Sequence, residues 1–522
     1  MLLFSHNKKL PMKKKVLLII MDGLGAAPQN RGNAVSLANP KNLIQLWDTF
    51  PHTYLLASSE AVGLPANTKG NSEVGHLNIG AGNVVTQTLP RINKSITGGS
   101  YQDNNTLWEA LRHAIKHRSN IHLMGCLSDG SVHSHINHFI ATIEFFAANN
   151  FTGEVLIHAF TDGRDTPPDH GRNYLAKMQN TVDKLGIGRI ATVCGRSIAM
   201  DRSMRWGKTE AAYNLLTRGE GERFNAWSEV FDRNYSNGIT DEFIKPAVIS
   251  QNGVLPTVKS GDAVIFMNYR ADRALQLTSA FTEPQFTFFS RELIPNLFFA
   301  SMVEYRKGTP LHVLFPKEYI TLPIGKVLSN NGIRQLRISE TEKFPHVTYF
   351  FNGGMSIKYQ GEDRIEVPSA NVATYDLKPE MSAMEIQEIL KYRISTDMYD
   401  FIVLNLANGD MVGHTGNINA SIKAVQVVDH CVNELVKRFT AAGGVVIITA
   451  DHGNVEEVIN LKSGEIDTEH SFNPVPFIIA DPDMSPRKLP YGALKDIAPT
   501  ILDIMDVPIP SEMGGKSLIR SL

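Results

Sequence analysis

The chain has 522 residues, and this length with 43% hydrophobic residues predicts more than one domain, each with a buried core. Its 51 basic and 53 acidic residues leave a formal net charge of −2, which excludes a strong overall field attracting nucleic acid or an anionic membrane. The three cysteines form no CxxC motif, which argues against a disulfide framework or a thiolate zinc site and favours a reducing, cytoplasmic compartment.

The first apolar run begins at Val16, and residues 1–12 are interpreted as a flexible extension. That run is too short for a signal-peptide core and lacks a small-residue cleavage site. No apolar stretch reaches the roughly 20 residues that a membrane span requires. We therefore expect neither a membrane nor a nucleic acid as a partner.

Seven runs rich in Val, Ile, Leu and Phe end abruptly in glycine or polar residues, which is typical of buried parallel strands. They are residues 16–23, 121–130, 155–165, 190–197, 263–273, 401–410 and 445–454. Helical spacing of apolar residues occurs between strands, at residues 381–394 and 421–439. The alternation predicts an α/β fold with parallel sheets covered on both faces.

Two kinds of polar side chain follow these strands, and each kind occurs in a different part of the chain. Carboxylates and histidines close strands near both ends of the sequence, whereas arginines close those in the middle. We therefore predict a discontinuous domain of residues 1–86 and 313–522, interrupted by an inserted domain of residues 87–312. Proline and polar residues cluster at both crossings.

The carboxylates and histidines of the outer segments have the chemistry of a metal site. The candidate ligands are Asp22, Asp410, His414, Asp451, His452 and His470. Carboxylate with imidazole suits manganese, zinc or iron. The spacing of Asp410 and His414 places both on one side of a helical turn. The alternative for each residue alone is a turn-capping aspartate or a satisfied histidine, but several strand-end carboxylates together require cations.

Ser72 is the candidate nucleophile, in a glycine-bearing turn before a predicted helix. A serine hydroxyl needs activation, and without a GxSxG elbow a metal is the preferred activator. The alternative is that Ser72 caps the helix. The glycine pair in MDGLG, which contains Asp22, is weak evidence for a nucleotide loop because the third glycine is missing.

The arginines of the middle segment could bind a small, doubly anionic substrate, since guanidinium groups grip phosphate and carboxylate with two prongs. The candidates are Arg164, Arg196, Arg202, Arg270 and Arg273. His133 and Asp165 add groups that could move protons. The alternatives are solvated surface ion pairs and ordinary turn residues.

Together, MDGLG, GNSEVGHLNIGAG, SDGSVHSHINH, FTDGRDTPP, GRSIAMDR, NYRADRA, GDMVGHTG, TADHGN and NPVPF resemble the 2,3-bisphosphoglycerate-independent phosphoglycerate mutases. That family belongs to the alkaline phosphatase superfamily, so the resemblance implies a phosphatase-like domain split by a transferase domain. It also implies two Mn²⁺ ions, with other divalent metals as alternatives, and no 2,3-bisphosphoglycerate. One ion would be held by Asp410, His414 and His470, and the other by Asp22, Ser72, Asp451 and His452.

The resemblance further implies that 3-phosphoglycerate and 2-phosphoglycerate interconvert through a phosphoserine at Ser72. Catalytic roles fall to Ser72, Asp165, His133 and Lys343. The substrate-binding residues would be His133, Arg164, Asp165, Arg196, Arg202, Arg270, Arg273 and Lys343. Gly409 and Glu469 depart from the family pattern, and Glu469 adds a negative charge beside His470.

Two other functions compete with this interpretation. The first is a metal-dependent phosphomonoesterase or a phosphopentomutase-like enzyme, against which the arginines and His133 argue. The second is a metal-stabilised binding protein without turnover, against which Ser72 beside a full ligand set argues. We expect a monomer whose partner is a small-molecule substrate.

Overall fold

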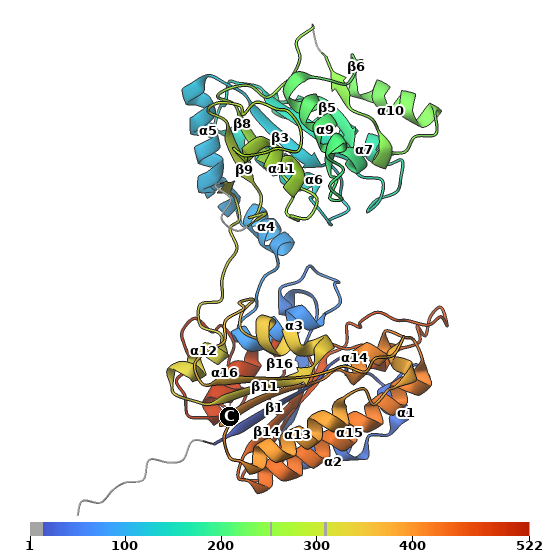
Figure 1. Ribbon diagram of the computed structural model, residues 1–522, viewed down its shortest axis with the longest axis vertical. Helices are drawn as coiled ribbons and strands as arrows, with labels where there is room; N and C mark the ends of the chain where they lie inside the picture. Colours follow the sequence, from blue (N-terminus) through green and yellow to red (C-terminus); the bar gives the residue numbers. More distant parts are fainter. Residues whose placement is uncertain (1–13, 251–252, 307–310, 521–522) are drawn as a thin grey trace, which may run out of the picture. The chain divides into compact units, whose positions relative to one another are not determined.

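The computed structural model describes residues 14–250, 253–306 and 311–520, so the extension predicted at residues 1–12 lies outside the described residues. The chain forms two compact units (Figure 1): unit 1 comprises Met1–Gln87 and Tyr319–Leu522, and unit 2 comprises Thr88–Glu318. The domain limits 86 and 312 stay predictions.

Unit 1 is built on one sheet, with strand order β12, β11, β13, β1, β14, β15, β2, β16 among the described residues. The strands are β1 (Val16–Met21), β2 (His52–Leu56), β11 (Gln335–Glu340), β12 (Glu362–Val367), β13 (Phe401–Leu406), β14 (Val445–Thr449), β15 (Val475–Ala480) and β16 (Gly492–Ala493). The three central strands β13, β1 and β14 are parallel and buried at every residue. Their continuous apolar sequences follow from this burial on both faces.

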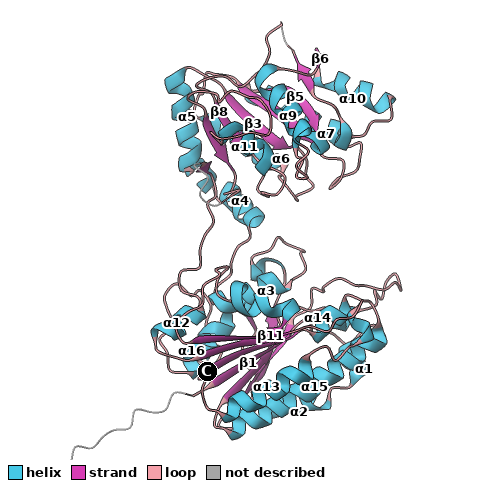
Figure 2. Cartoon of the chain, in the orientation of Figure 1, coloured by secondary structure: helices cyan, strands magenta, loops and turns pink. Residues whose placement is uncertain are grey.

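Helices cover both faces of the sheet in unit 1 (Figure 2). One layer contains α1 (Ala34–Ala38), α2 (Lys41–Thr49), α13 (Ala383–Ser395) and α15 (Ile418–Ala441). The other contains α3 (Ser72–Ala81), α12 (Ile324–Asn330) and α16 (Ile497–Ile504). The short helix α14 (Asn408–Gly413) follows β13. Side chains from strands and helices share one hydrophobic core, and this core holds the strand ends in place.

Unit 2 contains the second sheet, with order β10, β9, β8, β3, β4, β5, β7, β6 among the described residues. The strands are β3 (Ile121–Cys126), β4 (Val155–Thr161), β5 (Arg189–Gly195), β6 (Glu222–Phe224), β7 (Ala247–Ile249), β8 (Ala263–Phe266), β9 (Phe298–Ser301) and β10 (His312–Val313). The helices are α4 (Thr88–Thr97), α5 (Asn105–His117), α6 (Ile136–Ala148), α7 (Gly171–Leu185), α8 (Arg196–Ala199), α9 (Trp206–Arg218), α10 (Trp227–Ser236) and α11 (Leu275–Thr282). Two separate hydrophobic clusters lie in this unit, one with α5, α6, α7 and α10 and one with α9 and α11.

The predicted α/β class is confirmed, and each of the seven apolar runs contains a strand. The predicted helices at residues 381–394 and 421–439 correspond to α13 and α15. Most strand pairs in both sheets are parallel, as predicted, and the exceptions are β15, which is antiparallel to β14 and β2, and β7, which is antiparallel to β5. No α-helix lies between β14 and β15, so no crossover returns the chain in the parallel direction.

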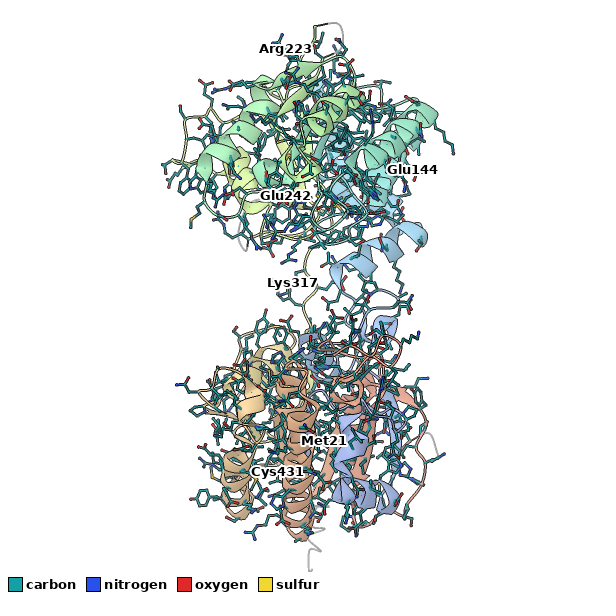
Figure 3. All side chains as sticks on the ribbon, turned by 90° about the vertical axis from the view of Figure 1, so that its right-hand side faces the viewer. Met21, Glu144, Arg223, Glu242, Lys317 and Cys431 are labelled. Carbon is teal, nitrogen blue, oxygen red and sulfur yellow. The ribbon has the colours of Figure 1, made fainter. Side chains whose placement is uncertain are left out.

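The three cysteines are buried and form no disulfide, as expected. Cys431 is labelled on α15 in Figure 3, where Met21 marks the end of β1. Within the described residues, we find no helix with the length and apolar character needed to cross a membrane.

Candidate metal centre and anion-binding group

The candidate metal ligands of unit 1 lie at the carboxyl ends of its central strands. Asp22 directly follows β1, Asp410 lies in α14 after β13, and Asp451 follows β14. Because these strands are adjacent and parallel, their carboxyl ends meet at one edge of the sheet. Two glycines permit the close approach: a Cβ on Gly23, whose φ is +74°, would lie 2.6 Å from Asp410 N, and one on Gly409 would lie 2.5 Å from Asp22 O.

Ser72 is the first residue of α3, and its hydroxyl faces the same carboxylates. The preceding residue, Asn71, caps the helix by accepting a hydrogen bond from Val74 N, so the alternative that Ser72 is the cap is wrong. Ser72 Oγ lies 3.2 Å from Asp22 Oδ1 and 2.9 Å from His452 Nε2. The Ser72 hydroxyl is therefore placed where charged groups act on it directly.

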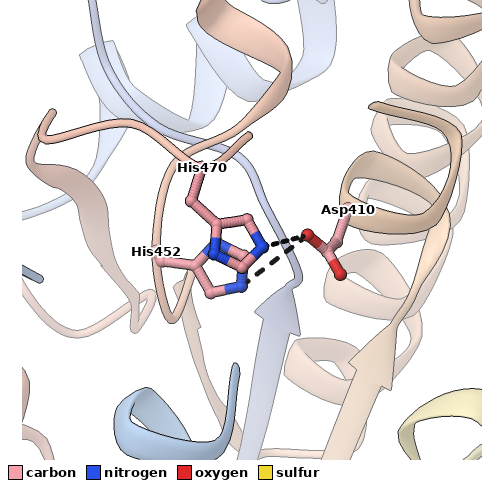
Figure 4. Close-up of side chains that lie close together, drawn as sticks. All are labelled: Asp410, His452 and His470. Atoms are coloured by element: carbon pink, nitrogen blue, oxygen red, sulfur yellow. Dashed lines mark ion pairs between the residues drawn. The ribbon is translucent and has the colours of Figure 1, made fainter. Parts of the chain in front are cut away.

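Two overlapping groups of side chains have the spacing of metal ligands. They are Asp410 with His452 and His470, and Asp22 with Asp451 and His452. In the first group, His470 Nε2 lies 3.1 Å and His452 Nε2 lies 3.8 Å from Asp410 Oδ1 (Figure 4). His414 joins this group, with Nε2 at 3.2 Å from Asp410 Oδ1 across one helical turn.

The donor atoms fit a divalent cation. His414 Nδ1 donates to the Thr468 carbonyl and His470 Nδ1 donates to the Gly70 carbonyl, so a neutral ring keeps its lone pair on Nε2. The two Nε2 atoms lie only 3.1 Å apart, an arrangement that a shared cation stabilises. Asp451 Oδ2 is buried without a hydrogen bond among the described residues, and a metal would satisfy it.

Within the described part of the chain, Lys343 is the only lysine that forms ion pairs with these carboxylates. It ends the 3₁₀ helix Thr341–Lys343, and its Nζ lies 2.9 Å from Asp22 Oδ1, 2.5 Å from Asp410 Oδ2 and 2.6 Å from Ser72 Oγ. Burial opposes its charge, but Asp22 and Asp410 outweigh burial and raise the pKa of Lys343. Reciprocally, Lys343 overcomes the effect of burial and lowers the pKa of Asp22. No local sequence pattern distinguishes Lys343, and its role was predicted only from the family resemblance.

In unit 2, His133 lies among carboxylates and arginines beyond the ends of the strands. Its Nε2 is 3.8 Å from Asp165 Oδ2 and its Nδ1 is 3.8 Å from Asp272 Oδ1. Burial, followed by the positive charge of Arg196, lowers the pKa of His133 to about 4. At neutral pH His133 is therefore an uncharged group, able to donate or accept one hydrogen bond at each nitrogen.

The predicted arginines surround the same region of unit 2. Arg196 is buried and donates to both Asp162 and Asp165 at 2.5 Å. Asp272 pairs with Arg202 at 2.6 Å and with Arg270 at 3.2 Å. The sequence interpretation did not single out Asp162 or Asp272, although each stands two residues from an arginine it named.

Arg273 and Arg164 complete the group, although within the described residues neither side chain forms an ion pair with the acidic residues at its centre. Arg273 Nη1 donates to the Met200 carbonyl at 3.3 Å, and Arg164 pairs with Glu242 at 3.6 Å. Burial, followed by repulsion from Arg196, Arg202 and Arg164, lowers the pKa of Arg273. The positive charges are thus close enough to repel one another, which favours an anionic ligand.

Comparison with known proteins identifies the family to which this fold belongs. Residues 14–509 match the model of the metalloenzyme superfamily. The 2,3-bisphosphoglycerate-independent phosphoglycerate mutase of Clostridium beijerinckii is 46% identical over 510 residues, which are 97% of this chain and 99% of the relative. That of Moorella thermoacetica is 47% identical over 513 residues, with the same coverage of 97% and 99%.

A solved structure supports the same placement. The crystal structure of Leishmania mexicana phosphoglycerate mutase at low cobalt concentration superposes with a TM-score of 0.60 at 30% identity, covering 99% of both chains. The α/β fold and the buried carboxylate and imidazole ligands are those of a divalent-metal-dependent enzyme of the metalloenzyme superfamily. Within that superfamily, the chain belongs to the 2,3-bisphosphoglycerate-independent phosphoglycerate mutases.

Proposed function

We propose that this chain interconverts 3-phosphoglycerate and 2-phosphoglycerate through a phosphoserine at Ser72, without 2,3-bisphosphoglycerate. The observation that carries the proposal is the placement of Ser72 Oγ, within 3.2 Å of Asp22, His452 and Lys343. A hydroxyl surrounded by buried carboxylates and a lysine is poised for nucleophilic attack once a cation balances the carboxylates.

Two divalent cations, with Mn²⁺ as the proposed occupant, fit the ligand set. Asp410, His414 and His470 would hold one, and Asp22, Ser72, Asp451 and His452 would hold the other. Bound there, divalent cations neutralise phosphoryl oxygens and lower the pKa of the serine hydroxyl. Carboxylate and imidazole ligands suit Mn²⁺, and thiolate ligands are absent from the described site.

Ser72 and Lys343 carry the transfer itself in unit 1. Ser72 gives its proton to solvent, its Oγ forms a bond to phosphorus, and the bond from phosphorus to the glycerate oxygen breaks as that oxygen takes up a proton. The Lys343 ammonium, 2.6 Å from Oγ, stabilises the serine oxygen while it is negatively charged. The position of Ser72 at the start of the ten-residue helix α3 also favours the negative phosphate.

The arginine group and Asp165 act on the glycerate. Arg164, Arg196, Arg202, Arg270 and Arg273 would bind the carboxylate and phosphate groups. Asp165 is proposed to protonate the departing 3-hydroxyl oxygen and to accept the proton from the 2-hydroxyl when that oxygen attacks phosphoserine. The reaction yields 2-phosphoglycerate and restores the Ser72 hydroxyl, and neutral His133 would hold the glycerate hydroxyls by hydrogen bonds.

Incubation with Mn²⁺ and 3-phosphoglycerate, free of 2,3-bisphosphoglycerate, tests the proposal. We expect 2-phosphoglycerate, measured by ³¹P NMR, to form without accumulation of inorganic phosphate. Release of phosphate alone would instead support a phosphomonoesterase, and no turnover with intact metal binding would support a binding protein.

The variant Ser72→Ala should lower the rate by at least about 10³-fold, because it removes the acceptor of the phosphoryl group. The matched control is Ser58→Ala, since the Ser58 hydroxyl bonds only to the Phe472 carbonyl in the described structure. Appreciable mutase activity in Ser72→Ala would eliminate the serine ester from the mechanism.

A further inference from the structure

Two fully buried side chains, His76 and Asn405, lie behind the candidate metal ligands, and the reaction described above does not use them. His76 is on α3, one helical turn after Ser72, and Asn405 is in β13. Buried imidazole and amide groups are costly unless hydrogen bonded, so their partners indicate what they do.

The hydrogen bonds of these two residues run in one direction. His76 Nδ1 lies 2.9 Å from the Ser72 carbonyl oxygen, which can only accept, so Nδ1 carries the proton. His76 Nε2 is then an acceptor, and Asn405 Nδ2 donates to it at 3.0 Å. The same Asn405 Nδ2 donates its other hydrogen to Asp22 Oδ2 at 2.7 Å. Flipping the amide would place its oxygen against the Asp22 carboxylate and repel it.

These contacts determine the orientation of the candidate metal ligands. Because Asn405 occupies Asp22 Oδ2, the other oxygen, Oδ1, faces Ser72 Oγ and Lys343. His76 Nδ1 also lies 3.2 Å from Asp451 Oδ2, the oxygen without a hydrogen bond among the described residues. Hydrogen bonds through Asn405 and His76 therefore connect Asp22 to the backbone of Ser72, and the same His76 ring contacts Asp451.

We propose that His76 and Asn405 are positioning residues that orient Asp22, Asp451 and Ser72 for the second divalent cation and for phosphoryl transfer. The inference rests on the proposed ligand set of Asp22, Ser72, Asp451 and His452. Groups that hydrogen-bond to metal ligands fix the orientation of those ligands, and losing them typically costs about 10- to 100-fold in metal affinity or activity.

Mn²⁺ titration of chelator-treated protein by isothermal calorimetry tests the inference with His76→Phe and Asn405→Leu. Each variant removes hydrogen bonds while keeping a side chain of similar size. We expect one of the two Mn²⁺ affinities to fall about 10- to 100-fold while the other is retained. We also expect kcat to fall with little change in KM for 3-phosphoglycerate, because the arginine group of unit 2 is untouched.

His346→Phe is the matched control. The His346 ring is 5.4 Å from that of His76 and partly buried, and its Nδ1 has no hydrogen-bond partner in the described structure. The control should bind both ions as the unmodified protein does. If either test variant fails to fold by circular dichroism, Asn405→Ser replaces it, because a smaller polar side chain removes the bond to Asp22 without introducing bulk.

The outcomes separate this inference from the proposed function. Unmodified protein that binds no Mn²⁺ would overturn the proposed metal set, and the inference with it. Unmodified protein that binds two ions, with folded variants matching it in both affinities and kcat, would overturn the positioning role alone. Equal weakening of both ions, or the same loss in His346→Phe, would also overturn it, because the effect would then be general.

Discussion

The candidate metal ligands of unit 1 and the arginine group of unit 2 both lie where parallel strands end, but the two groups differ in how far their charged side chains are exposed to solvent. Asp22, Asp451 and His452 have no exposed surface, whereas the side chains of Arg164 and Arg270 are 57% and 53% exposed. Buried charges must be balanced within the protein, but solvated ones need no partner. The difference indicates a largely buried reaction centre in one unit and, around the buried Arg196, a mostly solvated anion-binding group in the other.

Removing the buried ammonium group of Lys343 should have the largest effect on stability. In chelator, Lys343→Met should lower the free energy of unfolding by about 3–5 kcal/mol, because Asp22 and Asp410 lose a buried partner. Mn²⁺ should restore part of the loss. Urea unfolding with chelator and with Mn²⁺ measures both effects. The control is Lys358→Met, whose side chain is 56% exposed; equal stabilities in chelator for both variants would contradict the contrast.

Within the arginine group, we expect Arg196 to contribute mainly to stability and exposed members such as Arg270 to contribute mainly to ligand binding. Arg196→Met should lower the free energy of unfolding by about 3 kcal/mol, because it leaves Asp162 and Asp165 without their cation. Arg270→Met should leave stability nearly unchanged and raise KM for phosphoglycerate about 10-fold, because only a bond to the ligand is lost. Thermal unfolding measures the two stabilities, and steady-state kinetics measures KM. Equal destabilisation by both substitutions would refute this division of roles.

Glu340, a buried carboxyl at the end of β11, should give a smaller and pH-dependent effect. Burial raises its pKa to about 7, despite the opposing effect of the Ser369 hydroxyl. The folded protein therefore keeps a proton that the unfolded chain releases near pH 4.5, so stability falls as pH rises towards 7 and then levels off.

Glu340→Gln removes this cost and should stabilise the protein by up to about 3 kcal/mol at pH 8. At pH 4.5 the variant and the unmodified protein should be similar, because the Glu340 carboxyl is then protonated in the folded protein and still about half protonated in the unfolded chain. Urea unfolding at the two pH values measures the difference. A gain independent of pH would show that the carboxyl does not titrate in this range.

The smallest effect should come from Glu469, which departs from the family pattern and adds a negative charge beside His470. Its carboxylate is 76% exposed and pairs with Lys69 Nζ at 3.1 Å. Glu469→Ala should change the free energy of unfolding by less than about 1 kcal/mol, since exposed ion pairs contribute little. Calorimetric titration with Mn²⁺ should show similar affinities, and a large change would mean that the Glu469 charge acts on the metal despite Lys69.

Much of the architecture was predictable because it depends on short segments. The apolar runs before Asp22, Asp410 and Asp451 predict the central strands of unit 1, and all three are strands. The antiparallel β15 escaped prediction, since pairing direction depends on the connection through space and not on the composition of the strand. The alternative role of Ser72 as a helix cap missed by one residue, since Asn71 caps α3 and both residue types cap well.

The fold class, the chemical types at the strand ends and, through the motifs, the family could all be inferred from the order of the amino acids. The meeting of the strand ends, the position of Lys343 between Asp22 and Asp410, and the link from His76 and Asn405 to Asp22 are visible only in the folded molecule. The physical reason is that propensity and burial pattern act between near neighbours in sequence, whereas a hydrogen bond joins atoms brought together by the packed core. Asn405 and Asp22 are 383 positions apart, and no local pattern links them.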